Sequence, residues 1–452
     1  MRIRVCGAVE GGWLAGAQTP AMALALSIAT VLAVTGAAAE RHDSEAKLPL
    51  ANASELGFSR ERLDRLRALL QARVARGDLA GAVVLLSRRG QIGFLETLGW
   101  SDLETRRAMR TNTIFRLASA TKIVTSVALL SLYEEGRFGL TDPVADHLPA
   151  FRRLRVRNGP GEPAESQRPL LIRDLLRHTC GYGYGFRDPQ QSDYRTAGIL
   201  RPGPDLDWSH DLTLDDWVAT LAGLPLADEP GTRFDYGFCS DIAGLLIERL
   251  AKEPLDRVME QRIFRPLGMD DTGFLVPEAK LDRLASVYHV EDGRTRVLDR
   301  GASSPFRHRP KALSGGGGWD NLGNCGLVST APDFFRLLQM LLNGGKLDGV
   351  RILSAKTVEL MRQNHLAGLA SPDAFWPGVG FGFGYAVLYD LGRYGNVGSP
   401  GAMWWAGSTN VHYWVDPKEE LIGVFMTQVR PFPSDLMDVV RRLSWQAIEG
   451  RP

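Results

Sequence analysis

The sequence predicts an α+β fold in which an antiparallel sheet is flanked by helices and interrupted by a mostly helical insertion. Strand-like segments occur near both ends of the chain, at residues 81–100 and 411–428. Between them, residues 143–310 are divided by prolines, arginines and aspartates into short helical stretches and long loops. Strands at the two ends of a chain share a sheet when a middle section is inserted between them. We therefore expect residues 55–142 and 311–452 to form one sheet domain.

The first part of this domain combines a helix with a hairpin. Residues 58–76 carry leucines at helical spacing, and Ser59 is a residue type that caps helix N-termini. Residues 81–100 follow as two runs rich in β-forming residues, on either side of Arg-Arg-Gly-Gln at residues 88–91. This pattern predicts a helix followed by an antiparallel hairpin.

The last part of the chain has the same elements in reverse order. Residues 411–428 contain two apolar runs separated by a turn at Asp416-Pro417. Residues 434–449 show the periodicity of an amphipathic helix. We expect a second hairpin and a closing helix here.

The composition argues against a nucleic-acid partner and against a metal centre. The 452 residues carry a net charge of +1, which gives no basic surface for a polyanion. The eight histidines are scattered, and neither C-x-x-C nor H-E-x-x-H occurs. We expect no metal and no cofactor, and the oligomeric state is left open.

Residues 1–39 predict a secretory signal peptide. Arg2 and Arg4 precede an apolar run at residues 21–34, and small residues follow at Ala37-Ala38-Ala39. Cleavage after Ala39 would export the protein to the periplasm or the medium without stable membrane insertion. The alternative is an uncleaved N-terminal membrane anchor.

The cysteines do not form a disulfide framework. Cleavage of the signal would remove Cys6 and leave Cys180, Cys239 and Cys325. One bridge among these three can form, and the sequence does not select the pair. We expect Cys180 and Cys239 to be buried as small apolar side chains.

Ser119 and Lys122 stand three residues apart at the head of the apolar run 115–136. On a helix, two such residues lie on one face, and a helix N-terminus favours negative charge on the serine oxygen. Burial lowers the proton affinity of a lysine, so that Lys122 would accept the serine proton or hold the serine alkoxide. Taken alone, S-x-x-K is more typical of an N-cap serine followed by a lysine that reaches solvent.

Further segments point to a known family. They are LASATK (117–122), IRDLLRHTCGYGYGF (172–186), PGTRFDYGFCSDIAGLLIE (230–248), FRPLGMDDTGF (264–274), SGGGG (314–318), GLVSTAPDFFRLLQMLLNGGKLDGVRILS (326–354), GFGFGYAVLYD (380–390) and WWAGSTNVHYWVDPKEELIGVFMTQ (404–428). In this order they resemble the serine β-lactamase-related family, which includes class C β-lactamases, D,D-peptidases and family VIII carboxylesterases. The resemblance implies a β-lactamase/transpeptidase-like fold.

The resemblance also implies a catalytic site. Ser119 matches the acylated nucleophile, Lys122 its partner, and Tyr236 the tyrosine that moves the proton to the leaving group. The backbone N–H groups of Ser119 and Ser408 would form the oxyanion hole. His178 is expected to make structural hydrogen bonds.

Two departures from the β-lactamase pattern favour an esterase. Trp405-Ala406-Gly407 stands where β-lactamases have Lys-Thr-Gly, and Phe238 stands where they have an asparagine. Both changes remove polar contacts to a β-lactam, and a lost contact to its carboxylate costs about 1.5–3 kcal/mol. Family VIII esterases carry Trp-Gly-Gly at the first position. We expect Trp405, Ala406, Gly407 and Phe238 to line the substrate site, and segment 319–325 to form an extra loop.

These observations predict a serine hydrolase that forms an acyl-enzyme, most simply a carboxylesterase on small to medium acyl esters. Its partner would be a small-molecule ester or amide. The alternatives within the class are a β-lactamase, a D-amino-acid peptidase or transpeptidase, and an acyltransferase whose acyl-enzyme is captured by an acceptor other than water. A non-catalytic protein that binds a cell-wall ligand is the alternative from another class.

Overall fold

The computed structural model describes residues 48–157, 161–184, 190–199, 212–291, 294–300, 313–317, 326–371, 373–431 and 435–450. The predicted signal peptide, Cys325 and segment 319–325 lie outside these ranges. Within the described part of the chain, no helix combines the length and apolar character that crossing a membrane requires.

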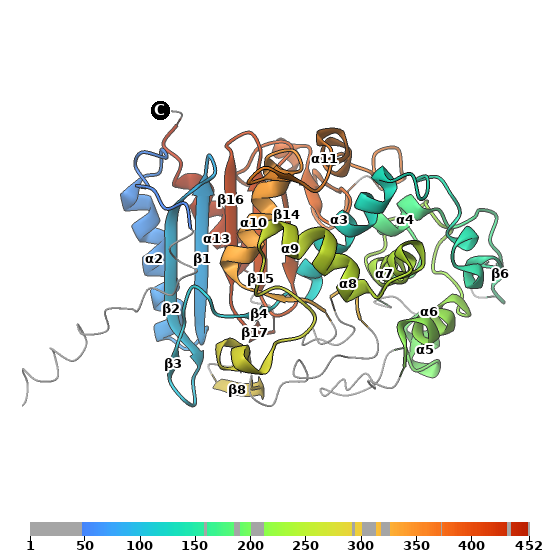
Figure 1. Cartoon of the computed structure of the whole chain (residues 1–452), viewed down its shortest axis with the longest axis horizontal. Coiled ribbons are helices and arrows are strands. Elements are labelled where there is room, and N and C mark those ends of the chain that lie inside the picture. The colour runs from blue at the N-terminus through green and yellow to red at the C-terminus, as the bar shows by residue number, and fades with distance from the viewer. Residues whose placement is uncertain are drawn as a thin grey trace, which may run out of the picture. The chain divides into compact units, whose positions relative to one another are not determined.

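The described chain is built on one sheet of eight strands in which every neighbouring pair is antiparallel (Figure 1). In spatial order the strands are β12 (Val379–Phe381), β13 (Ala386–Leu388), β14 (Met403–Gly407), β15 (Val411–Asp416), β16 (Leu421–Met426), β1 (Gly81–Arg88), β2 (Gln91–Asp102) and β3 (Arg107–Ala108). Both predicted hairpins are present, as β1–β2 and β15–β16. They join through β1 and β16, so strands from the two ends of the chain share a sheet as predicted.

Helices cover both faces of the sheet centre. Helix α2 (Arg60–Ala75) begins at the predicted cap Ser59 and packs against β2, while α13 (Leu436–Gln446) packs against α2 and β16. Helix α10 (Ala331–Leu342) packs against β1 and β16. Every residue of β1 and β16 is buried as a result, which fits the apolar runs at residues 82–86 and 421–426.

The central helix α3 (Thr121–Glu134) is buried along most of its length, from Thr121 to Leu132. It packs against α7 (Cys239–Ala251) and α8 (Leu255–Met259) of the middle section. A helix that is apolar on all sides is stable only when other elements enclose it. The sheet domain and the middle section therefore share this part of the core.

The middle section consists mainly of short helices, as the sequence predicted. They are η3 (Val144–Asp146), η4 (Pro149–Phe151), α4 (Ile172–Leu176), α5 (Gln190–Thr196), α6 (Leu214–Ala222), α7, α8, η5 (Glu260–Phe264), α9 (Arg265–Leu267) and η6 (Glu278–Arg283). Figure 1 shows α4 to α7 gathered on the side of the sheet away from α2. This section also contains strands β7 (Val287–Glu291) and β8 (Arg294–Asp299), and β7 pairs in parallel with β17 (Val429–Arg430) near the C-terminus.

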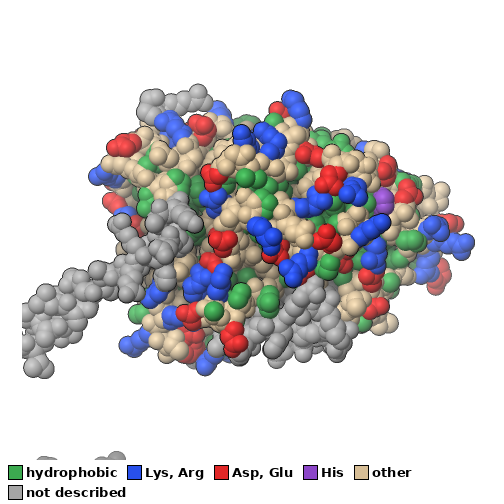
Figure 2. Space-filling view, viewed as in Figure 1, with side chains coloured by type: hydrophobic (Ala, Val, Ile, Leu, Met, Phe, Trp, Pro, Cys, Tyr) green, Lys and Arg blue, Asp and Glu red, His purple; other side chains and the backbone are tan. Residues whose placement is uncertain are grey.

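The remaining strands form short pairs, and two further helices lie in the C-terminal half. The pairs are β4 (Phe115–Arg116) with β9 (Val328–Ser329), β5 (Arg155–Val156) with β6 (Ala164–Glu165), β10 (Lys346–Leu347) with β11 (Val350–Arg351), and β7 (Val287–Glu291) with β8 (Arg294–Asp299) and β17 (Val429–Arg430). The helices are α11 (Ala355–Met361) and α12 (Leu391–Tyr394). On the face drawn in Figure 2, charges of both signs are interspersed, in keeping with the small net charge.

A disulfide joins Cys180 to Cys239, with the two Cα atoms 5.9 Å apart. Both cysteines are buried, as expected, and their bridge is one of the pairs that the sequence left open. The bridge ties the segment after α4 to the N-terminus of α7. Antiparallel backbone pairing of Gly183 with Gly237 joins the same two segments next to the disulfide.

We predict that replacing both bridged cysteines, Cys180→Ser with Cys239→Ser, lowers the free energy of unfolding by about 2–5 kcal/mol, because the bridge restricts the unfolded chain over a separation of 59 residues. Chemical denaturation of the oxidised proteins measures this loss. Ser54→Ala, at an exposed residue, is the control, and it should unfold like the wild type. Equal stability of all three proteins would show that the bridge does not stabilise the fold.

Candidate active site

The backbone around Ser119 is held in an unusual conformation. Ser119 lies in the short 3₁₀ helix η2 (Ala118–Ala120) that leads into α3, and Ala118 has a φ of +45°. A left-handed conformation at a residue other than glycine is uncommon and persists only where the surroundings impose it. Two glycines do so here. A Cβ at Gly317 would clash with the Ala118 carbonyl oxygen, and one at Gly407 would clash with the Leu117 carbonyl oxygen.

The glycine-rich segment beside Ser119 is fixed by side chains of two helices. Ser314 Oγ donates to Asp241 Oδ1 of α7 at 2.5 Å, and the Gly316 N–H donates to the same oxygen at 3.1 Å. Thr125 Oγ1 of α3 donates to the Gly315 carbonyl oxygen at 2.6 Å. Asp241 is fully buried, so its hydrogen bonds are made in a site without solvent competition. These contacts aim the Gly316 carbonyl oxygen at Lys122.

Lys122 is completely buried and uses its ammonium group as a three-way donor. Its Nζ lies 3.2 Å from Ser119 Oγ, 3.0 Å from the Tyr184 hydroxyl and 2.5 Å from the Gly316 carbonyl oxygen. A carbonyl oxygen only accepts, and an ammonium group offers three N–H donors where a neutral amine offers two. The geometry therefore fits a charged lysine.

The electrostatics agree with the geometry and correct the sequence-based expectation. Burial does lower the pKa of Lys122, as predicted. The phenol groups of Tyr184 and Tyr236 and the Asp241 carboxylate raise this pKa by more, so that it lies above its ordinary value. The net direction of the Lys122 pKa is therefore upward, which favours the ammonium form of this side chain.

Tyr236 lies beside this charge. The centre of its ring is 4.8 Å from Lys122 Nζ, and its hydroxyl accepts a hydrogen bond of 2.9 Å from Trp405 Nε1. A positive charge next to a phenol stabilises the phenolate that forms when the phenol gives up its proton. The structure therefore brings Ser119, Lys122, Tyr236 and Trp405 into one cluster, although they lie in separate parts of the sequence.

Tyr184 is a member of this cluster that the sequence analysis missed. Its hydroxyl accepts from Lys122, and its ring lies 5.4 Å from that of Tyr236. Burial raises the pKa of Tyr184 and the Lys122 charge opposes that rise, but the net direction is upward. The signal was present in the GYGYG stretch, residues 181–185. Its spacing does not reveal which tyrosine points at the lysine.

Phe238 and His178 lie behind the two tyrosines. Phe238 is 1% exposed and packs edge-on against Tyr184, with ring centres 4.8 Å apart, so it contacts the site through that tyrosine. His178 is buried beside Tyr236, with ring centres 4.7 Å apart, and its Nδ1 accepts from the Gly237 N–H at 3.3 Å. Burial and the nearby Lys122 charge hold the pKa of His178 well below its ordinary value. A neutral structural histidine was the expectation.

The end of β14 lies against the nucleophile segment. Gly407 approaches the backbone of Leu117 and Ala118, and Ser408, the next residue, is half-buried, as is Ser119. Ala406 is half-buried next to Trp405, which is 6% exposed. These positions suit the expected roles of Ser408 in an oxyanion hole and of residues 405–407 in substrate binding.

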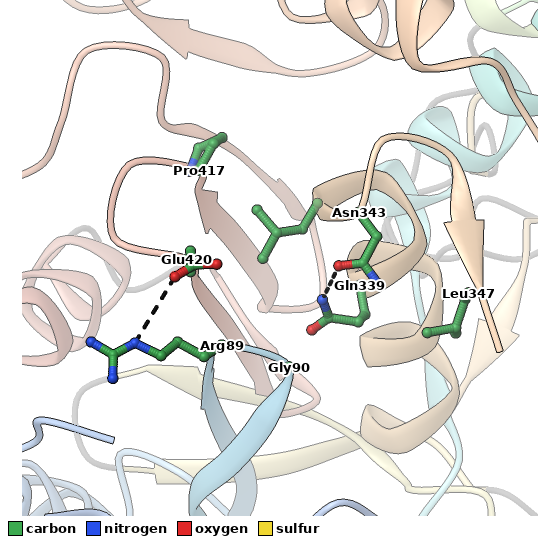
Figure 3. A pocket seen from close by; sticks show the side chains of 8 residues that line it. Arg89, Gly90, Gln339, Asn343, Leu347, Pro417 and Glu420 are labelled. Atoms are coloured by element: carbon green, nitrogen blue, oxygen red, sulfur yellow. Dashed lines mark hydrogen bonds and ion pairs between the residues drawn. The ribbon is translucent and has the colours of Figure 1, made fainter. Parts of the chain in front are cut away.

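A separate cavity of about 390 Å³ lies between the β1–β2 turn, the β15–β16 turn and the end of α10 (Figure 3). Arg89 and Glu420 form an ion pair of 3.9 Å across it, and Gln339 Nε2 donates to Asn343 Oδ1 at 2.8 Å. None of the residues that line it belongs to the Ser119 cluster.

Comparison with known proteins agrees with this geometry. The family model described as Beta-lactamase matches residues 66–444. This chain belongs to the Beta-lactamase family. It is 32% identical to Esterase EstB of Burkholderia gladioli over 78% of the chain and 86% of that protein. It is 31% identical to a lovastatin esterase of Penicillium rubens, over 81% and 93% respectively.

The solved structures give the same result for the fold. The structure titled "EstCE1, a hydrolase with promiscuous acyltransferase activity" superposes with a TM-score of 0.72 at 28% identity, over 86% of this chain and 98% of that one. The fold is therefore of the β-lactamase/transpeptidase type, as predicted.

We predict that Gly317→Ala impairs the site, because the added methyl group has no room beside Ala118 and Gly317 has a φ of +99°. The rate of labelling of Ser119 by a fluorophosphonate probe should fall at least about tenfold, since misplacement of a nucleophile by 1 Å costs more than this. Gly161→Ala is the matched control, because a Cβ there meets no atom within 4 Å and the backbone is not left-handed. Equal labelling of both variants would contradict the close approach.

We predict that Tyr184→Phe lowers kcat/KM about tenfold or more, because it removes an acceptor from a buried ammonium group. Loss of the phenol also removes a group that raises the pKa of Lys122, so the alkaline limit of activity should move to lower pH. The pH profile of kcat/KM measures both effects. Tyr182→Phe is the control, since the Tyr182 hydroxyl has no hydrogen-bond partner among the described residues. An unshifted alkaline limit in Tyr184→Phe would exclude this role.

Proposed function

We propose that this enzyme is a carboxylesterase that works through an acyl-enzyme on Ser119. The observation that carries the proposal is the convergence of Ser119, Tyr184 and Tyr236 on the buried Lys122 ammonium group, with Trp405 donating to Tyr236. The esterases among the relatives support the same activity.

In the proposed first step, Ser119 Oγ attacks the ester carbonyl carbon and its proton passes to Tyr236. Lys122 keeps its own proton. Its charge stabilises the negative charge that develops on Ser119 Oγ during attack. This assignment differs from a lysine base, because Lys122 has its three donors occupied and a raised pKa.

The tetrahedral intermediate then collapses. The backbone N–H groups of Ser119 and Ser408 would stabilise the oxyanion. Such stabilisation is usually the largest single contribution to the rate enhancement of acyl transfer. Tyr236 gives its proton to the leaving alkoxide oxygen, and the alcohol departs. Water, activated by the same tyrosine, attacks the acyl-enzyme and releases the acid together with free Ser119.

Trp405 favours an esterase activity over the alternative β-lactamase or peptidase activity. The indole of Trp405 is directed at the Tyr236 hydroxyl and carries no charge to pair with a substrate carboxylate. Phe238 is buried in the aromatic core and offers no amide to a substrate. Neutral esters therefore suit this site better than anionic β-lactams or peptide C-termini.

Export of the protein is part of the proposal. The disulfide between Cys180 and Cys239 is of the kind that persists in oxidising compartments such as the periplasm or the medium. It supports the interpretation of residues 1–39 as a cleaved signal peptide.

We predict that Ser119→Ala loses at least about 10³-fold in hydrolysis of 4-nitrophenyl butyrate, because no nucleophile remains. A fluorophosphonate probe should label the wild type and the control Ser54→Ala, which changes an exposed serine, but not Ser119→Ala. Equal labelling of wild type and Ser119→Ala would favour a non-catalytic ligand-binding protein.

The same experiment with nitrocefin distinguishes the activities within the class. We expect ester hydrolysis to exceed nitrocefin hydrolysis in the wild type, because Trp405 leaves the β-lactam carboxylate unpaired. Rapid nitrocefin turnover with negligible ester cleavage would refute the esterase assignment and favour a β-lactamase.

A further inference from the structure

Phe375 is a large apolar side chain with more than half of its surface exposed. It is 52% exposed, in the loop between α11 and β12. An exposed phenyl ring contributes less to the stability of the fold than a buried one, because its apolar surface stays in contact with water. A single exposed apolar residue needs no explanation, so its surroundings must decide whether Phe375 has a role.

Those surroundings are the proposed catalytic residues. The Phe375 ring centre lies 5.7 Å from that of Tyr236 and 5.8 Å from that of Trp405. It also contacts Phe234 and Trp376, at 5.5 and 5.8 Å. The exposed ring of Phe375 therefore packs directly against the ring of Tyr236, whose hydroxyl is proposed to move the proton.

The loop that carries Phe375 is fixed in place. Asp373 Oδ1 accepts from the Gly378 N–H at 3.0 Å and from the Tyr389 hydroxyl at 2.5 Å, while Asp373 Oδ2 pairs with Arg393 at 2.6 Å. The Ala374 N–H donates to the Val379 carbonyl oxygen at 2.7 Å. These hydrogen bonds restrain the loop and so pre-organise the Phe375 ring. Less conformational entropy is then lost when a ligand binds to it.

The direction of the reaction shows which part of an ester meets this ring. Tyr236 is proposed to protonate the leaving oxygen, so the alcohol part of the substrate lies on the Tyr236 side of Ser119. Phe375 packs against the rings of Tyr236 and Trp405, and its own ring neighbours are uncharged aromatic side chains. A flat, uncharged, aromatic group attached to the leaving oxygen fits such a surface, because aromatic rings attract one another in offset or edge-on contacts.

We propose that Phe375, with Trp405 and Tyr236, forms a subsite for the alcohol part of the ester and makes the enzyme selective for esters of aromatic alcohols such as benzyl alcohol. Asp373 acts as a positioning residue through the loop. This inference rests on the proposed esterase function and narrows its substrate class.

The test compares benzyl acetate, cyclohexylmethyl acetate and ethyl acetate, which have primary alcohols as leaving groups and form the same acetyl-enzyme. Hydrolysis of the acetyl-enzyme is the same for all three esters. Differences in kcat/KM therefore report binding and acylation, the steps in which the alcohol part is still present. The wild type should prefer benzyl acetate to both other esters. In Phe375→Ala the benzyl-to-ethyl ratio should fall about threefold to tenfold.

Further variants separate an aromatic subsite from simple packing. Phe375→Leu keeps an apolar side chain, so it should lose the preference for benzyl over cyclohexylmethyl and keep part of the preference over ethyl. Asp373→Asn should lower the benzyl-to-ethyl ratio because the loop loses its ion pair with Arg393. The control Leu275→Ala changes another exposed apolar residue, 41% exposed, and should leave every ratio unchanged.

The outcomes are distinguishable. Unchanged ratios in Phe375→Ala and Phe375→Leu, with ethyl acetate still hydrolysed and Ser119 still labelled, would overturn the subsite and leave the esterase proposal intact. Failure of the wild type to hydrolyse any of the three esters or to label at Ser119 would overturn the proposed function, and the subsite with it.

Discussion

The hydrogen bonds of the buried Lys122 ammonium group are the constraint on which the rest of the site depends. Transfer of an ammonium ion from water into a protein interior costs several kcal/mol even after relaxation. Each hydrogen bond to a charged group returns about 1.5–3 kcal/mol, so three well-placed acceptors are needed to offset that cost. Ser119, Tyr184 and Gly316 supply them, and each is brought to Lys122 by a different element of the fold.

The surrounding structure positions these three acceptors around Lys122. Gly317 and Gly407 let two further segments approach the backbone before Ser119 more closely than any side chain would permit. Asp241 fixes the segment that carries the Gly316 carbonyl oxygen. The Cys180–Cys239 disulfide and the backbone pairing beside it hold the segment of Tyr184 against that of Tyr236.

The same enclosure changes what Lys122 does. Burial alone would favour a neutral amine, and that reasoning predicted a base. The acceptors and the Asp241 carboxylate reverse the outcome, because their interactions with the charged form exceed the loss of hydration. The ammonium group then lies beside the two phenols, and in the proposed mechanism Tyr236 moves the proton. The aromatic side chains around Tyr236, among them Trp405 and Phe375, give the site an apolar wall where a β-lactamase has a lysine.

The sequence by itself determined the main elements of the sheet domain and several members of the site. Periodicity and turn residues located α2, both hairpins and α13, because these elements follow local rules of spacing, capping and strand length. Ordered motifs identified Ser119, Lys122, Tyr236 and Trp405. The tertiary structure alone decided the cysteine pair, the choice of Tyr184 from a stretch with two tyrosines, the acceptors around Lys122 and the contact of Phe375 with Tyr236. Each of these depends on distances between segments far apart in the chain, and spacing along a sequence carries no information about such distances.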